Sequence, residues 1–195
     1  MKRHLFLTGP IGCGKSTAIQ TALGDRLSQC GGFLTRRYRE PHLHFTLESP
    51  DGRIRKTFLD FASGTPEVNL SVFGKYGVQL LAPEGIDTPV CELAHNGNGY
   101  VLDEIGGIEL LNPAFASALE VILSSGIPIL GVVKSEGSAG ALIDKLGSTE
   151  EYELAAVKLR DQLRNDPDTL VYECTQHDEN ALLLARQWAE AFVHE

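Results

Sequence analysis

Short apolar runs and longer helical patterns alternate along most of this chain. Five apolar segments have the length and composition of strands: residues 4–8, 33–38, 100–102, 127–133 and 170–175. Four segments have a helical pattern: residues 18–27, 113–125, 150–165 and 178–193. Apolar residues three and four positions apart share one face of a helix, whereas short continuous runs suit buried strands. This alternation predicts an α/β fold, with a mostly parallel sheet covered by helices on both faces.

Residues 32–61 interrupt the alternation with a β pattern. Segments 33–38, 42–47 and 54–59 each resemble a strand, and Pro50-Asp51-Gly52 is a turn signal. Together they predict an antiparallel β-hairpin insert at about residues 32–61. The insert also contains many of the chain's cations: Arg36, Arg37, Arg39, Arg53, Arg55 and Lys56. We expect most of them on a solvated sheet face, where charge discourages edge pairing; binding of a polyphosphate or an acidic partner is the alternative.

A glycine-rich segment separates the first strand from the first helix. It reads Gly9-Pro10-Ile11-Gly12-Cys13-Gly14-Lys15-Ser16-Thr17 and fits the pattern G-x-x-x-x-G-K-[ST] of a phosphate-binding loop. Glycines let backbone N–H groups turn inward around an anion, and the next helix directs its positive dipole end at the same anion. The whole segment is therefore a candidate for nucleotide binding. Lys15 is expected to contact the β- and γ-phosphates, and the hydroxyl of Ser16 to bind Mg²⁺.

A pair of acidic residues, Asp103 and Glu104, follows the apolar segment 100–102. In P-loop proteins a carboxylate at the end of a strand holds Mg²⁺, and a second one can orient or deprotonate the attacking water. Asp103 suits the first role and Glu104 the second. The alternative is a solvated acidic pair, but a phosphate loop upstream requires a metal ligand and favours the catalytic interpretation.

Three further residues are secondary candidates. Lys134 follows the strand at 127–133, at the end where α/β sheets bind ligands, and an ordinary exposed lysine is the alternative. Lys75 and Tyr76 lie between Gly74 and Gly77. Such a turn can place Lys75 on a phosphate or Tyr76 on a base, or it can be only a tight connection.

Composition and charge narrow the range of partners. A chain of 195 residues with 43% hydrophobic residues suits a single domain spanning residues 1–195. The net charge of −9 argues against a dedicated nucleic-acid binder. No secretory signal or membrane-spanning segment is recognisable, and the four cysteines lack metal-ligand spacing. We therefore expect a cytoplasmic protein that binds a nucleoside triphosphate; the sequence does not identify a protein partner.

Several motifs resemble those of one known family. They are the loop Gly9–Thr17, Gly32-Phe33-Leu34-Thr35 with Arg39-Glu40, Gly74-Lys75-Tyr76-Gly77-Val78, Val101-Leu102-Asp103-Glu104-Ile105-Gly106 with Glu109-Leu110, and Tyr172-Glu173-Cys174-Thr175. In these motifs the chain resembles the small P-loop nucleoside-triphosphatases of the cancer-related NTPase family. The resemblance spans nearly the whole chain.

The resemblance implies a three-layer P-loop NTPase sandwich and slow, Mg²⁺-dependent hydrolysis of several nucleotides. It also implies that one stretch lines the nucleotide site: Tyr100, Val101, Leu102, Asp103, Glu104, Ile105, Gly106 and Gly107. The family is structurally close to small nucleotide kinases.

The chain departs from the family pattern at two places where basic residues are usual. Gly107 follows the D-E-I-G run in place of a lysine, and Gly137-Ser138-Ala139-Gly140 follows Lys134 in place of basic residues. Such cations can stabilise the transferring phosphoryl group. Their absence implies weak hydrolysis, and two alternatives stay open beside NTP hydrolysis: a small nucleotide or nucleoside kinase, and a nucleotide-dependent binding switch.

Overall fold

A computed structural model describes residues 1–82, 99–136, 143, 149–176 and 178–194. Its helices and strands are β1 (His4–Thr8), α1 (Lys15–Leu23), β2 (Gly31–Tyr38), β3 (His44–Glu48), β4 (Arg55–Asp60), β5 (Glu67–Val68), α2 (Val78–Leu81), β6 (Tyr100–Ile105), α3 (Pro113–Ser124), β7 (Ile129–Val133), α5 (Thr149–Asn165), β8 (Thr169–Glu173) and α6 (Glu179–Phe192). Short helical segments of other types occupy Gly24–Gln29, Phe73–Gly77 and Ile108–Leu111. The strands and helices predicted from periodicity are therefore present.

One sheet runs through the molecule in the order β5-β4-β3-β2-β6-β7-β1-β8. Strands β2, β6, β7, β1 and β8 pair with one another in parallel, whereas the pairs β2–β3, β3–β4 and β4–β5 are antiparallel. The loop after β1 and the acidic residues of β6 belong to strands that are not adjacent, because β7 lies between them. Both nevertheless reach the carboxyl-end edge of the parallel part, where α/β sheets bind ligands.

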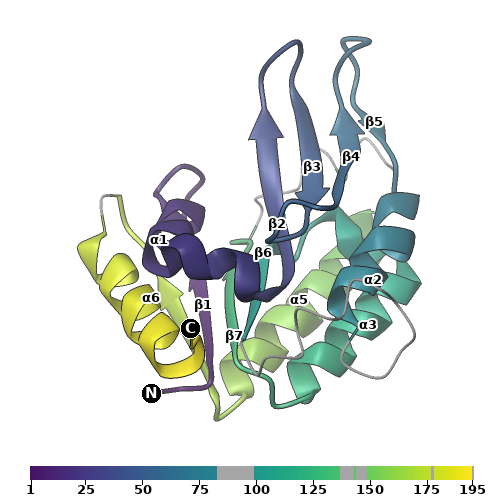
Figure 1. The fold of residues 1–195 in the computed structure, drawn as a ribbon. Helices are drawn as coiled ribbons and strands as arrows, with labels where there is room; N and C mark the ends of the chain where they lie inside the picture. The colour runs from purple at the N-terminus through teal and green to yellow at the C-terminus, as the bar shows by residue number, and fades with distance from the viewer. Residues whose placement is uncertain (83–98, 137–142, 144–148, 177, 195) are drawn as a thin grey trace.

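Helices cover both faces of the parallel strands (Figure 1). α1 and α6 lie on one face, and α2, α3 and α5 lie on the other. Each parallel strand contributes side chains to the hydrophobic core on both faces of the sheet, because successive side chains point to opposite faces. In β1, for example, Leu5 and Leu7 pack in the core under α1 and α6, while Phe6 packs in the core under α3 and α5. The prediction of an α/β sandwich with a mostly parallel sheet is confirmed.

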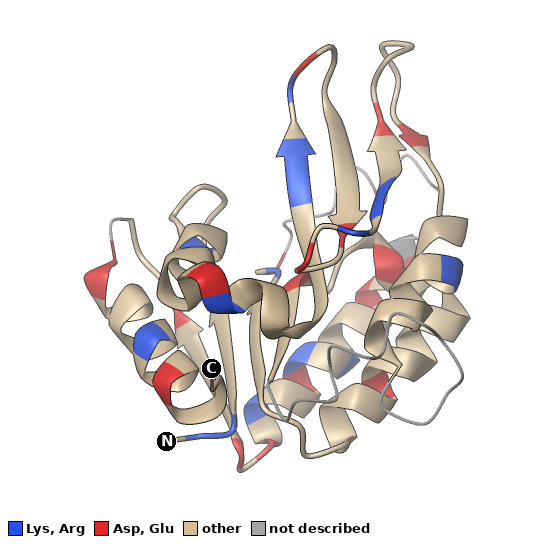
Figure 2. Ribbon diagram, viewed as in Figure 1, with Lys and Arg blue, Asp and Glu red and all other residues tan. Residues whose placement is uncertain are grey.

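The antiparallel strands project from the body as an extension of the sheet (Figure 1). This agrees with the predicted hairpin insert, although β5 adds a further short strand at Glu67–Val68. Figure 2 shows basic and acidic residues together on these strands. The insert is therefore not a continuous basic surface. That the whole chain forms a single domain stays a prediction.

The segment from 73 to 81 differs from the expected turn. Residues Phe73–Gly77 form a π-helical turn that continues directly into α2. The glycines serve close packing: a Cβ on Gly74 would lie 2.8 Å from Nδ2 of Asn112, and one on Gly77 would lie 2.6 Å from the ring of Phe115. The sequence pattern suggested a turn because glycine at close helix contacts and glycine in turns look alike.

Within the described residues, no helix is both long and apolar enough to cross a membrane.

Candidate active site

The phosphate loop lies at the carboxyl end of β1 and leads into α1. Gly9, Gly12 and Gly14 all have positive φ, at 126°, 81° and 100°. A Cβ on Gly9 would also lie 2.4 Å from the carbonyl oxygen of Cys174, which directly follows β8. Side chains at these positions would be strained, and at Gly9 they would clash with backbone. The loop conformation therefore depends on the glycines that define the motif.

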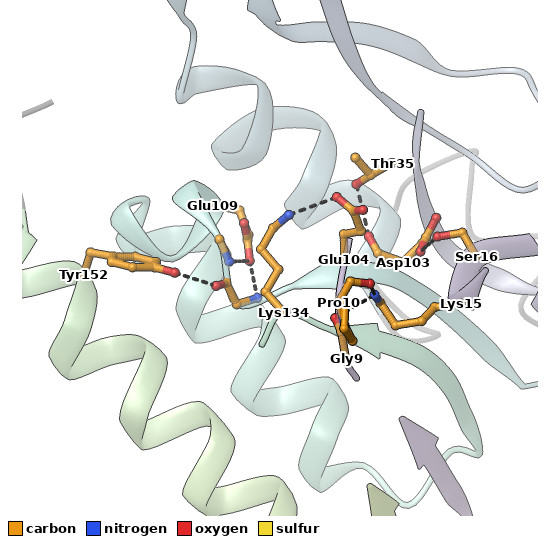
Figure 3. Close-up of polar contacts among 12 residues, drawn as sticks. Gly9, Pro10, Lys15, Ser16, Thr35, Asp103, Glu104, Glu109, Lys134 and Tyr152 are labelled. Atoms are coloured by element: carbon orange, nitrogen blue, oxygen red, sulfur yellow. Dashed lines mark hydrogen bonds and ion pairs between the residues drawn. The ribbon is translucent and has the colours of Figure 1, made fainter. Parts of the chain in front are cut away.

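Lys15 begins α1 and folds back over the loop. Its Nζ donates hydrogen bonds to the carbonyl oxygens of Gly9 and Pro10, at 2.9 and 2.7 Å (Figure 3). The same atom lies 3.6 Å from Sγ of Cys13. These partners lie in the loop itself. The ammonium group is thus held where the loop amides and the amino end of α1 also direct positive charge.

Ser16 and Asp103 meet although they come from different parts of the chain. The Ser16 hydroxyl donates a 2.7 Å hydrogen bond to Oδ1 of Asp103, and Thr35 Oγ1 donates to the Asp103 carbonyl at 3.0 Å (Figure 3). Asp103 is only 1% exposed. Burial, followed by the neighbouring charge of Glu104, raises the pKa of the Asp103 carboxyl to about 7, against the smaller effects of Ser16, Lys134 and Arg36.

The Ser16–Asp103 pair fits a metal ion. Oδ2 of Asp103 is buried and has no hydrogen-bond partner within the part of the chain that the structure describes. A buried carboxylate oxygen without a partner is costly, and a hard cation such as Mg²⁺ would satisfy it. Across the same residues no group of three or more His, Cys, Asp or Glu side chains forms a metal site. Such an ion would therefore need further oxygen ligands, which a nucleotide's phosphates can provide.

Glu104 lies in an irregular part of β6. The pairing of β6 with β7 shifts register between Leu102 and Ile105, and Glu104 has φ of 66°. It is the one non-glycine residue with positive φ among those described. Such a backbone is unusual for a glutamate and often marks a functional site. Asp103 is buried, whereas the side chain of Glu104, which lies within the register shift, is 36% exposed.

Lys134 follows β7 and forms an ion pair with Glu104. Its Nζ lies 2.9 Å from Oε2 of Glu104 (Figure 3). Burial alone would lower the pKa of Lys134, but the charges of Glu104, Glu109 and Asp103 raise it above its ordinary value. Lys134, one of the secondary candidates, is thus a charged ammonium group beside the acidic pair, and its phosphate contact stays a prediction.

Sequence reasoning gave no role to two residues that support the loop after β6. Glu109 is buried, and its Oε1 accepts hydrogen bonds from the backbone N–H groups of Gly106 and Gly107, at 2.6 and 2.7 Å. Tyr152, on α5, donates to the carbonyl oxygen of Gly106 at 3.0 Å (Figure 3). Nothing in the local pattern could reveal Tyr152, because its contact joins residues 46 positions apart.

Gly107 stands where the family resemblance leads us to expect a lysine. A Cβ on Gly107 would lie 2.6 Å from Cε of Lys134, so the stem of Lys134 occupies that space. A cation is therefore present here, but it comes from the end of β7. The other departure, Gly137–Gly140, lies outside the described residues.

Several predicted site residues lie elsewhere. Tyr100, Val101, Leu102 and Ile105 are fully buried in the sheet, so their side chains do not line an open site; they carry the acidic pair. Lys75 and Tyr76 lie in the helical turn that leads into α2, on the sheet face opposite α1 (Figure 1). There the Tyr76 ring contacts the ammonium groups of Lys75 and Lys56. The fold does not bring these two candidates to the phosphate loop.

Known proteins resemble this chain over most of its length. A family model described as NTPase matches residues 4–168. The cancer-related nucleoside-triphosphatase of Homo sapiens is 31% identical, and its homolog in Mus musculus is 30% identical, each over 94% of both chains. The nucleoside-triphosphatase THEP1 of Methanosarcina barkeri is 29% identical over 82% of this chain and 92% of its own.

The fold also matches a solved structure. The crystal structure of THEP1 from the hyperthermophile Aquifex aeolicus superposes with a TM-score of 0.64, covering 93% of this chain and 95% of that one, at 18% sequence identity. At this identity the match supports the P-loop NTPase fold and no more. The family model and the relatives in Homo sapiens and Mus musculus show that this chain belongs to the NTPase family.

Proposed function

We propose that this protein hydrolyses nucleoside triphosphates to the diphosphate and phosphate in a Mg²⁺-dependent reaction. The observation that supports this most is the 2.7 Å hydrogen bond between Ser16 and Asp103, which joins the phosphate loop to the acidic pair across β7. The family and the names of its members point to the same reaction.

The phosphate loop supplies binding. Its backbone N–H groups and Lys15 would hold the β- and γ-phosphates, since they are the positive groups at the amino end of α1. Nothing in this part of the site distinguishes one base from another. We therefore propose broad nucleotide specificity, because the loop recognises the triphosphate that all nucleotides share.

Glu104 is the proposed general base. Its carboxylate would accept a proton from a water molecule as the water oxygen forms a bond to the γ-phosphorus. The bond between that phosphorus and the bridging oxygen then breaks, and the diphosphate leaves with the electron pair. The partial exposure of Glu104 suits this role, since a water molecule must reach it.

Ser16 and Asp103 would hold Mg²⁺, for which the unsatisfied Oδ2 of Asp103 is the clearest sign. The ion would neutralise charge on the phosphates when it is bound. A cytoplasmic location and a nucleoside triphosphate as the main partner complete the proposal.

Phosphate release from ATP, GTP, CTP and UTP, with and without Mg²⁺, tests this function. Wild type should release phosphate from several nucleotides only with Mg²⁺. Glu104→Gln should bind nucleotide but lose turnover by about 10²-fold or more, the usual scale for a general base. Lys15→Ala should lose binding itself.

Two results would contradict the proposal. Full activity in Glu104→Gln would exclude Glu104 as the base. Binding without release in wild type would instead favour a switch or a kinase, and adding nucleosides and nucleotides as phosphate acceptors would separate the two.

A further inference from the structure

Lys134 occupies a central position at the ligand-binding edge of the sheet. It directly follows β7, the strand between β1 and β6, and its backbone N–H donates a 2.8 Å hydrogen bond to the carbonyl oxygen of Ile105. It therefore lies between the strand that carries the phosphate loop and the strand that carries the acidic pair. The edge formed by the carboxyl ends of parallel strands is where α/β sheets bind ligands.

The side chain of Lys134 is held in one direction by packing. Its stem passes over Gly107, where a Cβ would lie 2.6 Å from Cε and 3.2 Å from Cδ of Lys134, and 2.8 Å from Oε2 of Glu109. Gly107 has φ of −114°, outside the left-handed region that favours glycine, and the close contacts of a Cβ are what disfavour a side chain here. The missing side chain at Gly107 thus leaves a channel that the stem of Lys134 fills.

This direction brings the ammonium group to Glu104. The 2.9 Å ion pair joins side chains that are 27% and 36% exposed (Figure 3). While the pair is formed, one oxygen of the proposed base binds an ammonium group and is less available to accept a proton from water. A partly exposed pair is weak enough to be exchanged for a better partner.

The terminal phosphate of a nucleoside triphosphate is such a partner. It carries more negative charge than a single carboxylate, and Lys134 is next to the carboxylate that would act on it. A diphosphate, bound in the same loop, lacks this group. Lys134 can therefore respond to the presence of the γ-phosphate. Lys15 is expected to contact the β-phosphate as well, and both the triphosphate and the diphosphate have that group.

We propose that Lys134 binds the γ-phosphate and that its ion pair with Glu104 is a latch, which opens when a triphosphate binds and releases Glu104 for the reaction. The inference rests on the proposed function for its catalytic consequence, but the binding difference between triphosphate and diphosphate does not require hydrolysis.

Binding measurements with Mg²⁺ separate this role from a structural one. We would titrate ADP and the β,γ-imido analogue of ATP into wild type and Lys134→Met, which keeps the length of the stem but not its charge. Lys134→Met should bind ADP within about twofold of wild type but lose about 10- to 100-fold affinity for the analogue, the scale of one charge-assisted hydrogen bond. An unchanged ratio of the two affinities would overturn the proposal.

A matched control and a second variant keep the test independent of folding. Lys158→Met makes the same change at an exposed lysine of α5, which pairs with Glu120, and should alter neither affinity. Gly107→Ala keeps the charge but obstructs the stem, and should lower affinity for the analogue more than for ADP. If Gly107→Ala leaves the ratio of the two affinities unchanged, the proposed packing role of Gly107 is wrong.

A double-mutant cycle tests the latch. Glu104→Gln should bind the analogue several-fold more tightly than wild type, because Lys134 no longer has to leave a carboxylate. Loss of charge repulsion could produce the same gain, but only the latch requires the gain to disappear in Lys134→Met. An equal gain in both backgrounds would rule the latch out.

The hydrolysis proposal can fail separately. If wild type releases no phosphate and the affinities still behave as described, the binding role of Lys134 stands and hydrolysis is wrong. If wild type hydrolyses ATP and Lys134→Met keeps its affinity ratio, hydrolysis stands and the role of Lys134 is wrong.

Discussion

Ser16 donates a 2.7 Å hydrogen bond to Asp103, although 87 positions separate the two residues. Ser16 lies in the first turn of α1, the helix that follows β1, and Asp103 lies in β6. Strand β7 separates β1 from β6 in the sheet. The bond joins the helix that begins at the phosphate loop to a carboxylate that is almost inaccessible to solvent.

Both partners of this bond should be needed for dependence on Mg²⁺. Ser16→Ala and Asp103→Asn should each lower phosphate release by about 10-fold or more and raise the Mg²⁺ concentration for half-maximal activity, because each would remove a proposed ligand of the ion. The fold-loss of phosphate release in the double variant should be smaller than the product of the two single fold-losses, since both residues would act on one ion. Ser28→Ala, at an exposed hydroxyl beyond α1, is the control and should resemble wild type. Strictly additive losses would mean that the two residues act separately.

Glu109 should support the loop that carries Gly106 and Gly107. Glu109→Ala leaves two buried N–H groups without their acceptor and should lower the free energy of unfolding by about 2–6 kcal/mol, at about 1–3 kcal/mol for each group. Urea denaturation measures this loss. Glu109→Gln keeps an acceptor oxygen and should restore most of the stability. Equal losses in both variants would show that the charge of Glu109, not its hydrogen bonds, is what matters.

His4 should make the protein less stable in mild acid. Burial lowers the pKa of His4, as does Arg3, while Asp166 and Asp168 act in the opposite direction. The unfolded chain therefore takes up this proton first, near its ordinary pKa of 6.5, and stability falls as the pH decreases below that value. The slope from His4 is at most about 1.4 kcal/mol per pH unit.

Comparison with His4→Gln isolates this contribution. Chemical denaturation of both proteins between pH 7 and pH 5 should give a shallower loss of stability for the variant, whatever its stability at pH 7. Parallel curves would show that His4 takes up its proton equally in the folded and unfolded states, and would contradict a lowered pKa in the folded protein.

Gly32 should be much less tolerant of substitution than another glycine with a similar backbone. Gly32 has φ of 90°, and a Cβ there would lie 2.1 Å from the carbonyl oxygen of Val101 in the neighbouring strand. Gly64 has φ of 82° with nothing within 4 Å. Gly64→Ala should cost about 1–2 kcal/mol from backbone strain alone. Gly32→Ala should cost about 3 kcal/mol or more, because β2 must separate from β6. Similar values in urea denaturation would contradict the close approach.

Local sequence determined much of this protein. The glycines of residues 9–14 specify a loop that few other residues can form, and the spacing of apolar residues specifies most helices and strands. These features depend on neighbouring residues, because backbone conformation and periodicity are local properties. The loop, Lys15 and the acidic pair could therefore be identified from the amino-acid sequence alone.

The tertiary structure decided which of these residues meet. The order of the strands brings Ser16 to Asp103 and Lys134 to Glu104. Packing of the Phe73–Gly77 turn with α2 and α3 places Lys75 and Tyr76 on the sheet face opposite α1. The space over Gly107 and the left-handed backbone of Glu104 likewise depend on packing between distant segments. Local periodicity records which face of an element is apolar but not which other element covers it, so these contacts could be seen only in the folded chain.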